Sequence, residues 1–490
     1  MQSVDHLADA LDAIAPQVLE LCHAPGISVA VGVGEDVVLA RGYGHADLST
    51  GRPMDPATVG PTGSDAKPYT AAAALQLVDR GVLDLDEPVN DHLGDLRIVN
   101  PHGERPITLR DLLTHRSGLG TTVGFCDLVP PPPLGDHLRR VFARGTTDAY
   151  DGELFPLWAT PVGQHYQYSN TGIAVVGYLV ERTNPDGVPF GEWVRRHLYE
   201  PLGMTSSCFP PAPIAEHVPP GILERRSAGY ATLEGLQLRL PPIFVGDHPA
   251  GSALTTPSDH VRFLLAIAGE GRLGDAAVLR PETAREMITP QATRGFELSS
   301  SVGLVWNVFD HGDEHTYFGH GGEYMWGWHS VARAWPNQRA AVNVQVNQFD
   351  LGDQGTSDRP SHLAGRLVLD VVDAWVRGHD PRPRRDEAAS RSHLAGLMIA
   401  DRLIGRLGIP TAYTDDDIAA TVGDAVVAPT APWDPAAFAS AMRHARSTER
   451  GLLASAELWR AELPAHLRDL VARQLGVPGL AKLADLSLLT

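Results

Sequence analysis

The chain has 490 residues, of which 43% are hydrophobic and 20% charged, as expected for a soluble globular protein with more than one domain. Its 59 acidic and 40 basic residues give a formal net charge of −19, which argues against nucleic acid or an anionic membrane as a partner. The cysteines, Cys22, Cys126 and Cys208, show no metal-binding spacing and suit a reducing compartment, so we expect a cytoplasmic protein.

The first segment, residues 1–21, is predicted to be an amphipathic helix rather than a signal peptide. Its apolar residues recur every three or four positions, and no cationic end precedes them. No stretch of the sequence approaches the roughly 18 to 20 apolar residues that a membrane helix needs. Two β-rich runs follow, residues 27–33 and 37–40, joined by the turn Gly34-Glu35-Asp36. A helix followed by antiparallel strands indicates an α+β fold.

The next segment places a serine and a lysine at the start of a helix. An alanine-rich run over residues 71–81 favours helix, and Ser64 and Lys67 stand just before it. At this spacing both side chains lie on one face, so the Lys67 amine can reach the Ser64 oxygen, as a base reaches its nucleophile. The helix N-terminus also offers N–H groups to a developing oxyanion. A capping serine followed by a solvated lysine would give the same pattern.

Two segments that contain histidine are predicted to be structural. His115 ends a short helix capped by Thr108, where a histidine usually has a structural role. Residues 310–315 contain several acidic and histidine side chains, but they join two strand-like runs, 302–309 and 316–320. We interpret this cluster as a solvated turn and expect no bound metal.

Two further stretches place polar side chains at the ends of predicted elements. Tyr168 and Asn170 precede a helix predicted over residues 171–180. A tyrosine there can shuttle a proton, and an amide can hold a substrate carbonyl, although a packed tyrosine and a capping asparagine would also fit. His320-Gly321-Gly322 ends a strand, and consecutive glycines let the backbone approach a ligand closely.

Taken in order, three motifs resemble those of the serine β-lactamase and penicillin-binding-protein superfamily, namely Ser64-Asp65-Ala66-Lys67, Tyr168-Ser169-Asn170 and His320-Gly321-Gly322. The resemblance spans residues 27–347. It points to the class C-like branch, which includes D-aminopeptidases, DD-carboxypeptidases, family VIII esterases and acyltransferases. It implies an antiparallel sheet flanked by helices and an all-helical lobe, with Ser64 in the groove between sheet and lobe.

The resemblance also implies roles for these residues, in a mechanism that uses neither metal nor organic cofactor. Ser64 would be acylated, with Lys67 as its base and Tyr168 as the proton relay. The substrate would contact Asn170 and the strand His320-Gly321-Gly322. The oxyanion hole would consist of the backbone N–H groups of Ser64 and Glu323.

The sequence departs from the superfamily pattern at two positions. His320 stands where many β-lactamases carry lysine, which weakens recognition of a substrate carboxylate. β-Lactams and D-Ala-D-Ala peptides are therefore less expected as substrates. Asp65 is also unusual, and its charge near Lys67 would help to keep that lysine protonated.

We expect a serine hydrolase that cleaves an ester or amide of a small molecule through an acyl-Ser64 intermediate. One alternative is an intracellular biosynthetic transacylase that passes the acyl group to an amine or alcohol. Trp326 and Trp328 follow the third motif and could form a pocket wall that excludes water, although they could equally pack the sheet against its helices. A minor alternative is a catalytically silent binding protein.

The sequence predicts two domains. Residues 1–378 would form the β-lactamase-like hydrolase domain, and residues 379–386 a Pro- and Arg-rich linker. Residues 387–490 show helical spacing of apolar residues and are predicted to form a small all-helical extension outside the resemblance.

Overall fold

The computed structural model describes residues 2–381, apart from 121–125, 128–129, 144–156, 165, 213, 234–235, 242, 294–299, 310–314, 325–326 and 351–359. The predicted C-terminal domain, most of the predicted linker, Trp326 and most of the turn at 310–315 lie outside the described residues. Within the described ranges, no helix is long and apolar enough to cross a membrane.

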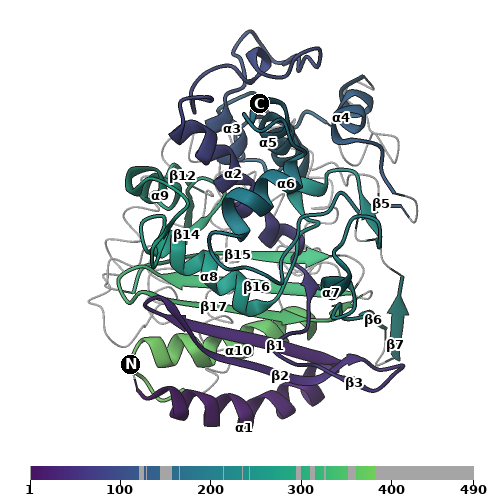
Figure 1. Ribbon diagram of the computed structural model, residues 1–490, viewed down its shortest axis with the longest axis vertical. Helices are drawn as coiled ribbons and strands as arrows, with labels where there is room; N and C mark the ends of the chain where they lie inside the picture. Colours follow the sequence, from purple (N-terminus) through teal and green to yellow (C-terminus); the bar gives the residue numbers. More distant parts are fainter. Residues whose placement is uncertain are drawn as a thin grey trace, which may run out of the picture.

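A nine-stranded antiparallel sheet forms the centre of the molecule, in the order β12-β13-β14-β15-β16-β17-β1-β2-β3 (Figure 1). The predicted hairpin is confirmed, since β1 pairs with β2 around Gly34, whose positive φ of 68° suits glycine. The strands of this sheet are β12 (Ala292–Thr293), β13 (Ser300–Val302), β14 (Asn307–Phe309), β15 (Tyr317–Tyr324), β16 (Trp328–Trp335), β17 (Ala340–Val346), β1 (Gly26–Val33), β2 (Asp36–Asp47) and β3 (Arg52–Pro53).

One predicted strand is wrong in its extent. The run 302–309 was expected to be continuous, but it is divided between β13 and β14. Val305 adopts a positive φ of 66° between them, and its N–H donates to Leu113 O at 2.7 Å. A tight turn in which Gly303 N donates to Trp306 O at 2.9 Å, together with the contact to Leu113, interrupts the strand here.

Two helices from opposite ends of the described chain cover one face of the sheet. They are α1 (Val4–Cys22), which confirms the predicted first helix, and α10 (Pro360–Val376). Figure 1 shows both helices on the same side of the sheet, and they share one apolar core with it. This face therefore serves stability rather than the site.

The opposite face carries the helices that position the site. The longest are α2 (Lys67–Asp79), α5 (Asn170–Thr183) and α8 (Pro257–Ala268), which share a second core with the sheet. Shorter helices complete this half, namely α3 (Leu109–Leu113), α4 (Leu134–Ala143), α6 (Phe190–Val194), α7 (Pro220–Leu223) and α9 (Pro281–Met287). The α+β class predicted from the sequence, an antiparallel sheet with helices on it and a helical lobe beside it, is confirmed.

Four smaller sheets accompany the large one in the described part of the chain. They are formed by β4 (Gly60–Pro61) with β9 (Leu254–Thr255), β5 (Cys126–Asp127) with β8 (Phe244–Val245), β10 (Arg272–Leu273) with β11 (Ala276–Ala277), and β6 (Gly229–Leu233) with β7 (Leu236–Leu240) and β18 (Gln348–Asp350). The pairing of β4 with β9 matters most for the site, because the chain passes from β4 directly into the turn that carries Ser64.

Candidate active site

Ser64 lies in a single 3-10 turn, Gly63–Ala66, which continues into α2 at Lys67. Lys67 Nζ is 2.8 Å from Ser64 Oγ, so the amine contacts the hydroxyl as the sequence predicts. The same amine donates to Ala250 O at 2.8 Å, and the Lys67 side chain is fully buried. A lysine held between a serine oxygen and a carbonyl oxygen is aimed at that serine and is not a solvated surface lysine.

The surroundings of Lys67 make its amine a usable base near neutral pH. Burial lowers the pKa of Lys67 to about 7, while the charges of Asp247 and Asp65 act in the opposite direction. Asp247 is itself buried, and the loss of solvation raises its pKa to about 6. An amine with a pKa near 7 is neutral in a substantial fraction of molecules at physiological pH, as a general base requires.

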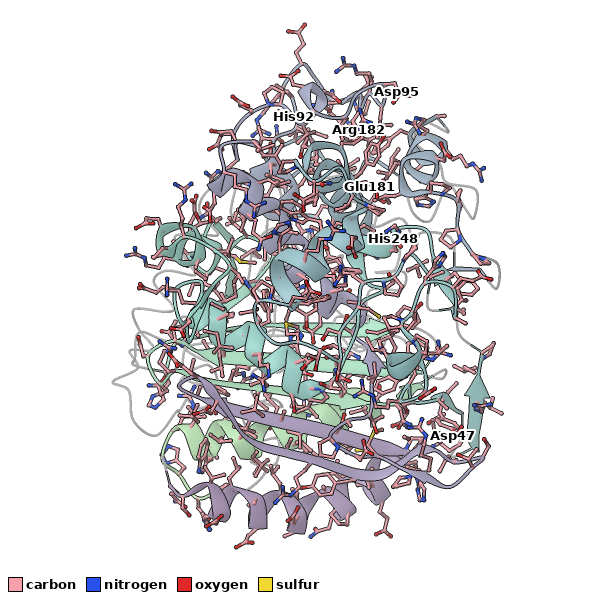
Figure 2. All side chains as sticks on the ribbon, viewed as in Figure 1. Asp47, His92, Asp95, Glu181, Arg182 and His248 are labelled. Carbon is pink, nitrogen blue, oxygen red and sulfur yellow. The ribbon has the colours of Figure 1, made fainter. Side chains whose placement is uncertain are left out.

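Asp247 was not identified from the sequence. It directly precedes the 3-10 turn His248–Ala250, whose last residue supplies the carbonyl that accepts from Lys67. Thr70 Oγ1, on α2, donates to Pro249 O at 2.6 Å and ties this loop to the helix of the nucleophile. His248 lies in the helical half of the molecule (Figure 2), where burial lowers its pKa to about 3 and keeps it uncharged. The neighbouring segment Pro249-Ala250-Gly251 also resembles the superfamily, but this resemblance does not single out Asp247.

The Asp65 side chain contacts the sheet. It is fully buried, and one of its oxygens accepts from Ser330 Oγ on β16 at 2.5 Å. Ser330 accepts in turn from Asn343 Nδ2 on β17 at 3.1 Å. The other oxygen, Oδ1, is 3.9 Å from His320 Nδ1 and accepts no hydrogen bond from any described residue.

Burial raises the pKa of Asp65 to about 8, although the bond from Ser330 and the charge of Lys67 both oppose the shift. The charge of Asp65 taken alone raises the pKa of Lys67, as the sequence analysis expects. The net pKa of Lys67 is nevertheless lowered, because desolvation of the amine is the larger effect.

The second motif stands directly over the lysine. Lys67 Nζ is 4.8 Å from the centre of the Tyr168 ring. Ser169 caps α5, its Oγ accepting from Gly172 N at 2.9 Å, so Asn170 opens the helix. Asn170 Oδ1 is buried and has no hydrogen-bond partner among the described residues, which leaves an acceptor for a ligand.

His115 supports this motif from behind. Its side chain is buried, and its Nδ1 accepts from Ser169 N at 3.2 Å. Its ring centre lies 4.6 Å from that of Tyr168, and its carbonyl accepts from Gln167 N at 2.6 Å. These contacts agree with the structural role that the sequence predicted for His115.

The third motif lies against the turn that carries the nucleophile. Gly63 has a φ of 54°, and a Cβ built on it would come within 2.7 Å of Glu323 N, C and O. A Cβ on Gly322 would clash with Thr62 O. The backbone of Glu323 therefore faces the residue just before Ser64, and two glycines permit this approach. His320 is buried and Gly321 is exposed, so the strand presents backbone to solvent beside the site.

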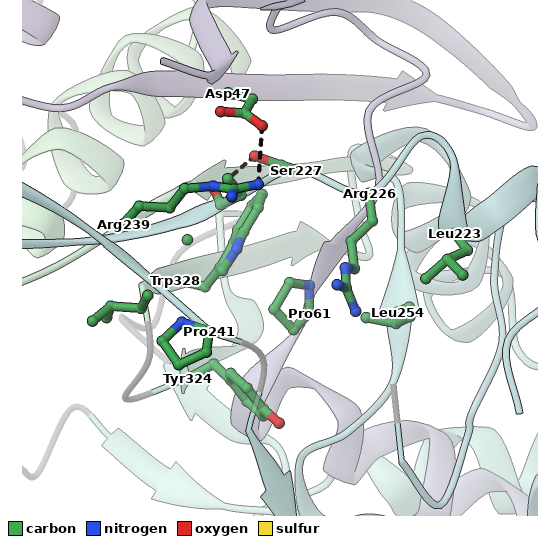
Figure 3. Close-up of a pocket in the computed structure, with 13 residues that line it drawn as sticks. Asp47, Pro61, Leu223, Arg226, Ser227, Arg239, Pro241, Leu254, Tyr324 and Trp328 are labelled. Carbon is green, nitrogen blue, oxygen red and sulfur yellow. Dashed lines mark hydrogen bonds and ion pairs between the residues drawn. The ribbon is translucent and has the colours of Figure 1, made fainter. Parts of the chain in front are cut away.

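Trp328, the candidate wall residue that the structure describes, belongs to a packed cluster. It is 2% exposed and contacts Ala46, Met54 and Tyr324. This packing fits the alternative that the sequence left open. Trp328 also lines a cavity of about 710 Å³ together with Tyr324 (Figure 3).

Comparison with known proteins shows the family of the chain. The sequence profile of the family described as Beta-lactamase matches residues 11–366. Protein Rv1367c of Mycobacterium tuberculosis is 29% identical over 368 residues, which cover 66% of this chain and 86% of that protein. Esterase EstB of Burkholderia gladioli is 33% identical over 217 residues, which cover 41% of this chain and 52% of EstB.

A solved structure shares the fold. EstCE1, described as a hydrolase with promiscuous acyltransferase activity, superposes with a TM-score of 0.57 at 18% identity and covers 74% of this chain and 98% of that one. The matched segment begins within α1 and ends within α10, and it contains Ser64, Lys67, Tyr168 and His320. The chain belongs to the beta-lactamase family, among relatives that include esterases and other hydrolases.

Proposed function

We propose that this protein is a serine hydrolase that cleaves an ester or amide of a small molecule through an acyl-Ser64 intermediate. The observation that carries the proposal is the 2.8 Å contact between Ser64 Oγ and the buried amine of Lys67, whose pKa is lowered to about 7. The esterase EstB, a relative in the same family, supports an ester as the bond that is cleaved.

In the first half of the reaction, neutral Lys67 takes the proton of Ser64 as Oγ attacks the substrate carbonyl carbon. The carbonyl oxygen becomes an oxyanion, which accepts from the backbone N–H groups of Ser64 and Glu323. The bond to the leaving group then breaks, and Tyr168 relays the proton from Lys67 to the departing alcohol or amine. The products of this half are the acyl-Ser64 ester and the free leaving group.

In the second half, water replaces the leaving group. Tyr168 takes a proton from the water as its oxygen attacks the acyl carbon, and relays it to Lys67, which later returns it to Ser64 Oγ. Collapse of the second oxyanion breaks the bond to Ser64 Oγ, which recovers its proton, and releases a carboxylic acid. Asn170, with its buried unpartnered Oδ1, would bind a donor of the substrate, such as an amide N–H, and hold the acyl group in place.

The test is the intact mass of the protein after brief exposure to a p-nitrophenyl ester. We expect the wild type to gain the mass of one acyl group and Ser64→Ala to gain none. Lys67→Met, which keeps the length of the side chain but has no base, should acylate at least about a hundredfold more slowly. Absence of an adduct and of turnover with several activated acyl donors would refute the proposal and favour a binding protein.

The same experiment separates hydrolysis from transfer. Transfer is the second candidate because EstCE1, which shares the fold, is described as having promiscuous acyltransferase activity. If an added amine clears the adduct much faster than water does and forms an amide, the protein is a transacylase. Clearance at the same rate with and without amine assigns it to the hydrolases.

A further inference from the structure

Glu323, whose backbone N–H is a proposed oxyanion donor, has a side chain on the other face of the sheet. Successive side chains of a strand point to opposite faces. Gly322 faces the turn of the nucleophile, where a Cβ on it would clash with Thr62 O. On the opposite face, which α10 covers, Glu323 Oε1 accepts from His362 Nε2 at 3.1 Å. One residue thus connects the proposed oxyanion hole to a helix behind the sheet (Figure 1).

His362 is held in place by a second ring. Its ring centre lies 4.1 Å from that of His329 and the two planes are inclined by 23°, so the rings stack. His329 is buried, and it is the cross-strand partner of Glu323 in the pairing of β15 with β16. Gly365 lies one turn after His362 on α10, and a Cβ built on it would come within 3.1 Å of His329 Cδ2. The glycine therefore lets α10 approach the sheet closely enough for the two rings to meet.

The bond between His362 and Glu323 is partly shielded from water. The two side chains are 27% and 30% exposed, and the stacked ring of His329 covers one side of His362. A hydrogen bond to an ionised carboxylate is stronger than one between neutral groups. On the other face, Tyr324 Oη donates to Ile243 O at 2.5 Å, so the residue after Glu323 is held separately.

An oxyanion hole depends on N–H groups that are fixed where the negative charge develops. Its donors lie about 2.7–3.1 Å from the position of the oxyanion, and a misplacement of about 1 Å can slow a reaction about a hundredfold. Glu323 is the next-to-last residue of β15, and the ends of strands open more readily than their centres. A side-chain bond to Glu323 therefore restrains its amide where the pairing of the strand restrains it least.

We propose that His362 is a positioning residue of the oxyanion hole. By donating to the Glu323 carboxylate, it fixes the backbone N–H of Glu323 relative to Ser64, and His329 keeps the His362 ring in place. In this role His362 contacts neither the nucleophile nor the substrate and acts through Glu323. The proposal rests on the proposed function, because an oxyanion forms only if Ser64 attacks a carbonyl carbon.

The test follows acylation of Ser64 by stopped flow at several concentrations of a p-nitrophenyl ester. This separates the rate constant of acylation from the dissociation constant of the ester. His362→Phe keeps a ring that can stack on His329 but has no N–H. We expect its acylation rate constant to fall about ten- to a hundredfold, while the dissociation constant changes less than about twofold, because the oxyanion develops only in the transition state. His362→Gln, which retains an N–H donor, should recover most of the lost rate.

Two comparisons connect the loss of rate to this one bond. Glu323→Ala should slow acylation as much as His362→Phe does, and the double variant should be no slower than either, because all three lack the same bond. His197→Ala is the matched control, since the His197 side chain is 25% exposed, contacts the Trp193 ring and has its Nε2 at 2.9 Å from Asp186 Oδ2. His197 lies in the helical half of the molecule, so His197→Ala should keep the acylation rate constant of the wild type.

The possible outcomes separate the two proposals. If the wild type is acylated and His362→Phe is acylated at the same rate, the positioning role is overturned and the hydrolase stands. A weaker affinity for the ester at an unchanged rate constant would overturn it too, because His362 would then bind substrate. If activated esters do not acylate the wild type, both proposals fail. Should His362→Phe not fold, Glu323→Ala against Glu323→Gln, which keeps an acceptor, makes the same test.

Discussion

Replacing Asp247 by asparagine tests whether the buried acid sets the basicity of Lys67. The charge of Asp247 is the largest effect that raises the pKa of Lys67 against its burial, which brings the net value to about 7. An opposite charge within about 4–6 Å shifts a pKa by about 1–3 units. The pKa of Asp247 is raised to about 6, so this carboxyl is only partly ionised near pH 6 and its effect on Lys67 is reduced. We therefore expect a shift of about one unit in the pKa of Lys67, the lower end of that range.

The effect on acylation follows from the neutral fraction of the lysine. At pH 6 about 9% of Lys67 is neutral if its pKa is about 7, and about 50% if its pKa is about 6. The acid limb of kcat/KM in Asp247→Asn should therefore move about one pH unit lower, with up to about a fivefold gain at pH 6. The plateau at pH 8 should fall, because a weaker base accepts the Ser64 proton less readily.

The assay is kcat/KM for a p-nitrophenyl ester between pH 5 and pH 9, with acylation followed by stopped flow. Asp136→Asn, which removes an exposed acid on α4, is the matched control and should leave the limb in place. A limb that stays at its wild-type pH in Asp247→Asn, or that moves to higher pH, would refute the assignment of this limb to Lys67. The Tm of the variant shows whether it remains folded.

Three further predictions concern the turn of the nucleophile. Because the folded-state pKa of Asp65 is about 8 against 3.8 for the free side chain, this group contributes stability below pH 4 that is lost as the pH rises to 8. The Tm of Asp65→Asn minus the Tm of the wild type should therefore be larger at pH 9 than at pH 5, because the wild type loses stability over this range. The same difference at both pH values would contradict this prediction. Ser330→Ala removes the hydrogen bond to buried Asp65 and should lower the free energy of unfolding by about 1–3 kcal/mol in urea titrations, whereas Ser49→Ala, near the surface, should cost less. Gly63→Ala forces a Cβ against the Glu323 backbone, so we expect acylation to slow by at least about tenfold while Gly34→Ala, at a turn with open space around it, leaves the rate unchanged.

The sequence predicted the parts of the site that depend on local spacing. The contact between Lys67 and Ser64 follows from their separation by three residues at a helix start. The helix after Tyr168 was also predicted, but the alternative of a capping asparagine is wrong, because Ser169 is the cap and Asn170 is the first residue of the helix. The strands β1, β2 and β15 were predicted at least in part, because their segments contain β-rich runs, whereas β16 was not predicted. The order of three motifs then identified the family that the comparisons confirm.

The parts that depend on distant contacts could not be predicted. Asp247 acts on Lys67 only because a loop far along the chain folds onto α2. The pKa of Asp65 is raised because its carboxyl is buried, and it contacts Ser330 on β16. No local pattern in the sequence predicts this burial. The break at Val305 comes from a tight turn together with the hydrogen bond to Leu113, and the local β-rich pattern gives no sign of that distant bond. Neither the proposed roles of Tyr168 and Glu323 nor the predicted C-terminal domain is tested by the geometry.

The pairing of β1 with β17 has a consequence for how the protein acquires activity during synthesis. This pairing joins Ile27 to Val346, so the centre of the sheet combines the beginning and the end of the catalytic domain. Ser64 and Lys67 leave the ribosome early, but the strand that faces their turn, β15, and the strand that bonds Asp65, β16, emerge far later. Contacts of such long sequence separation form slowly. A nascent chain that already carries Ser64 and Lys67 therefore lacks the strands that complete the proposed site, and we expect no acylation of Ser64 before β15 and β16 have folded.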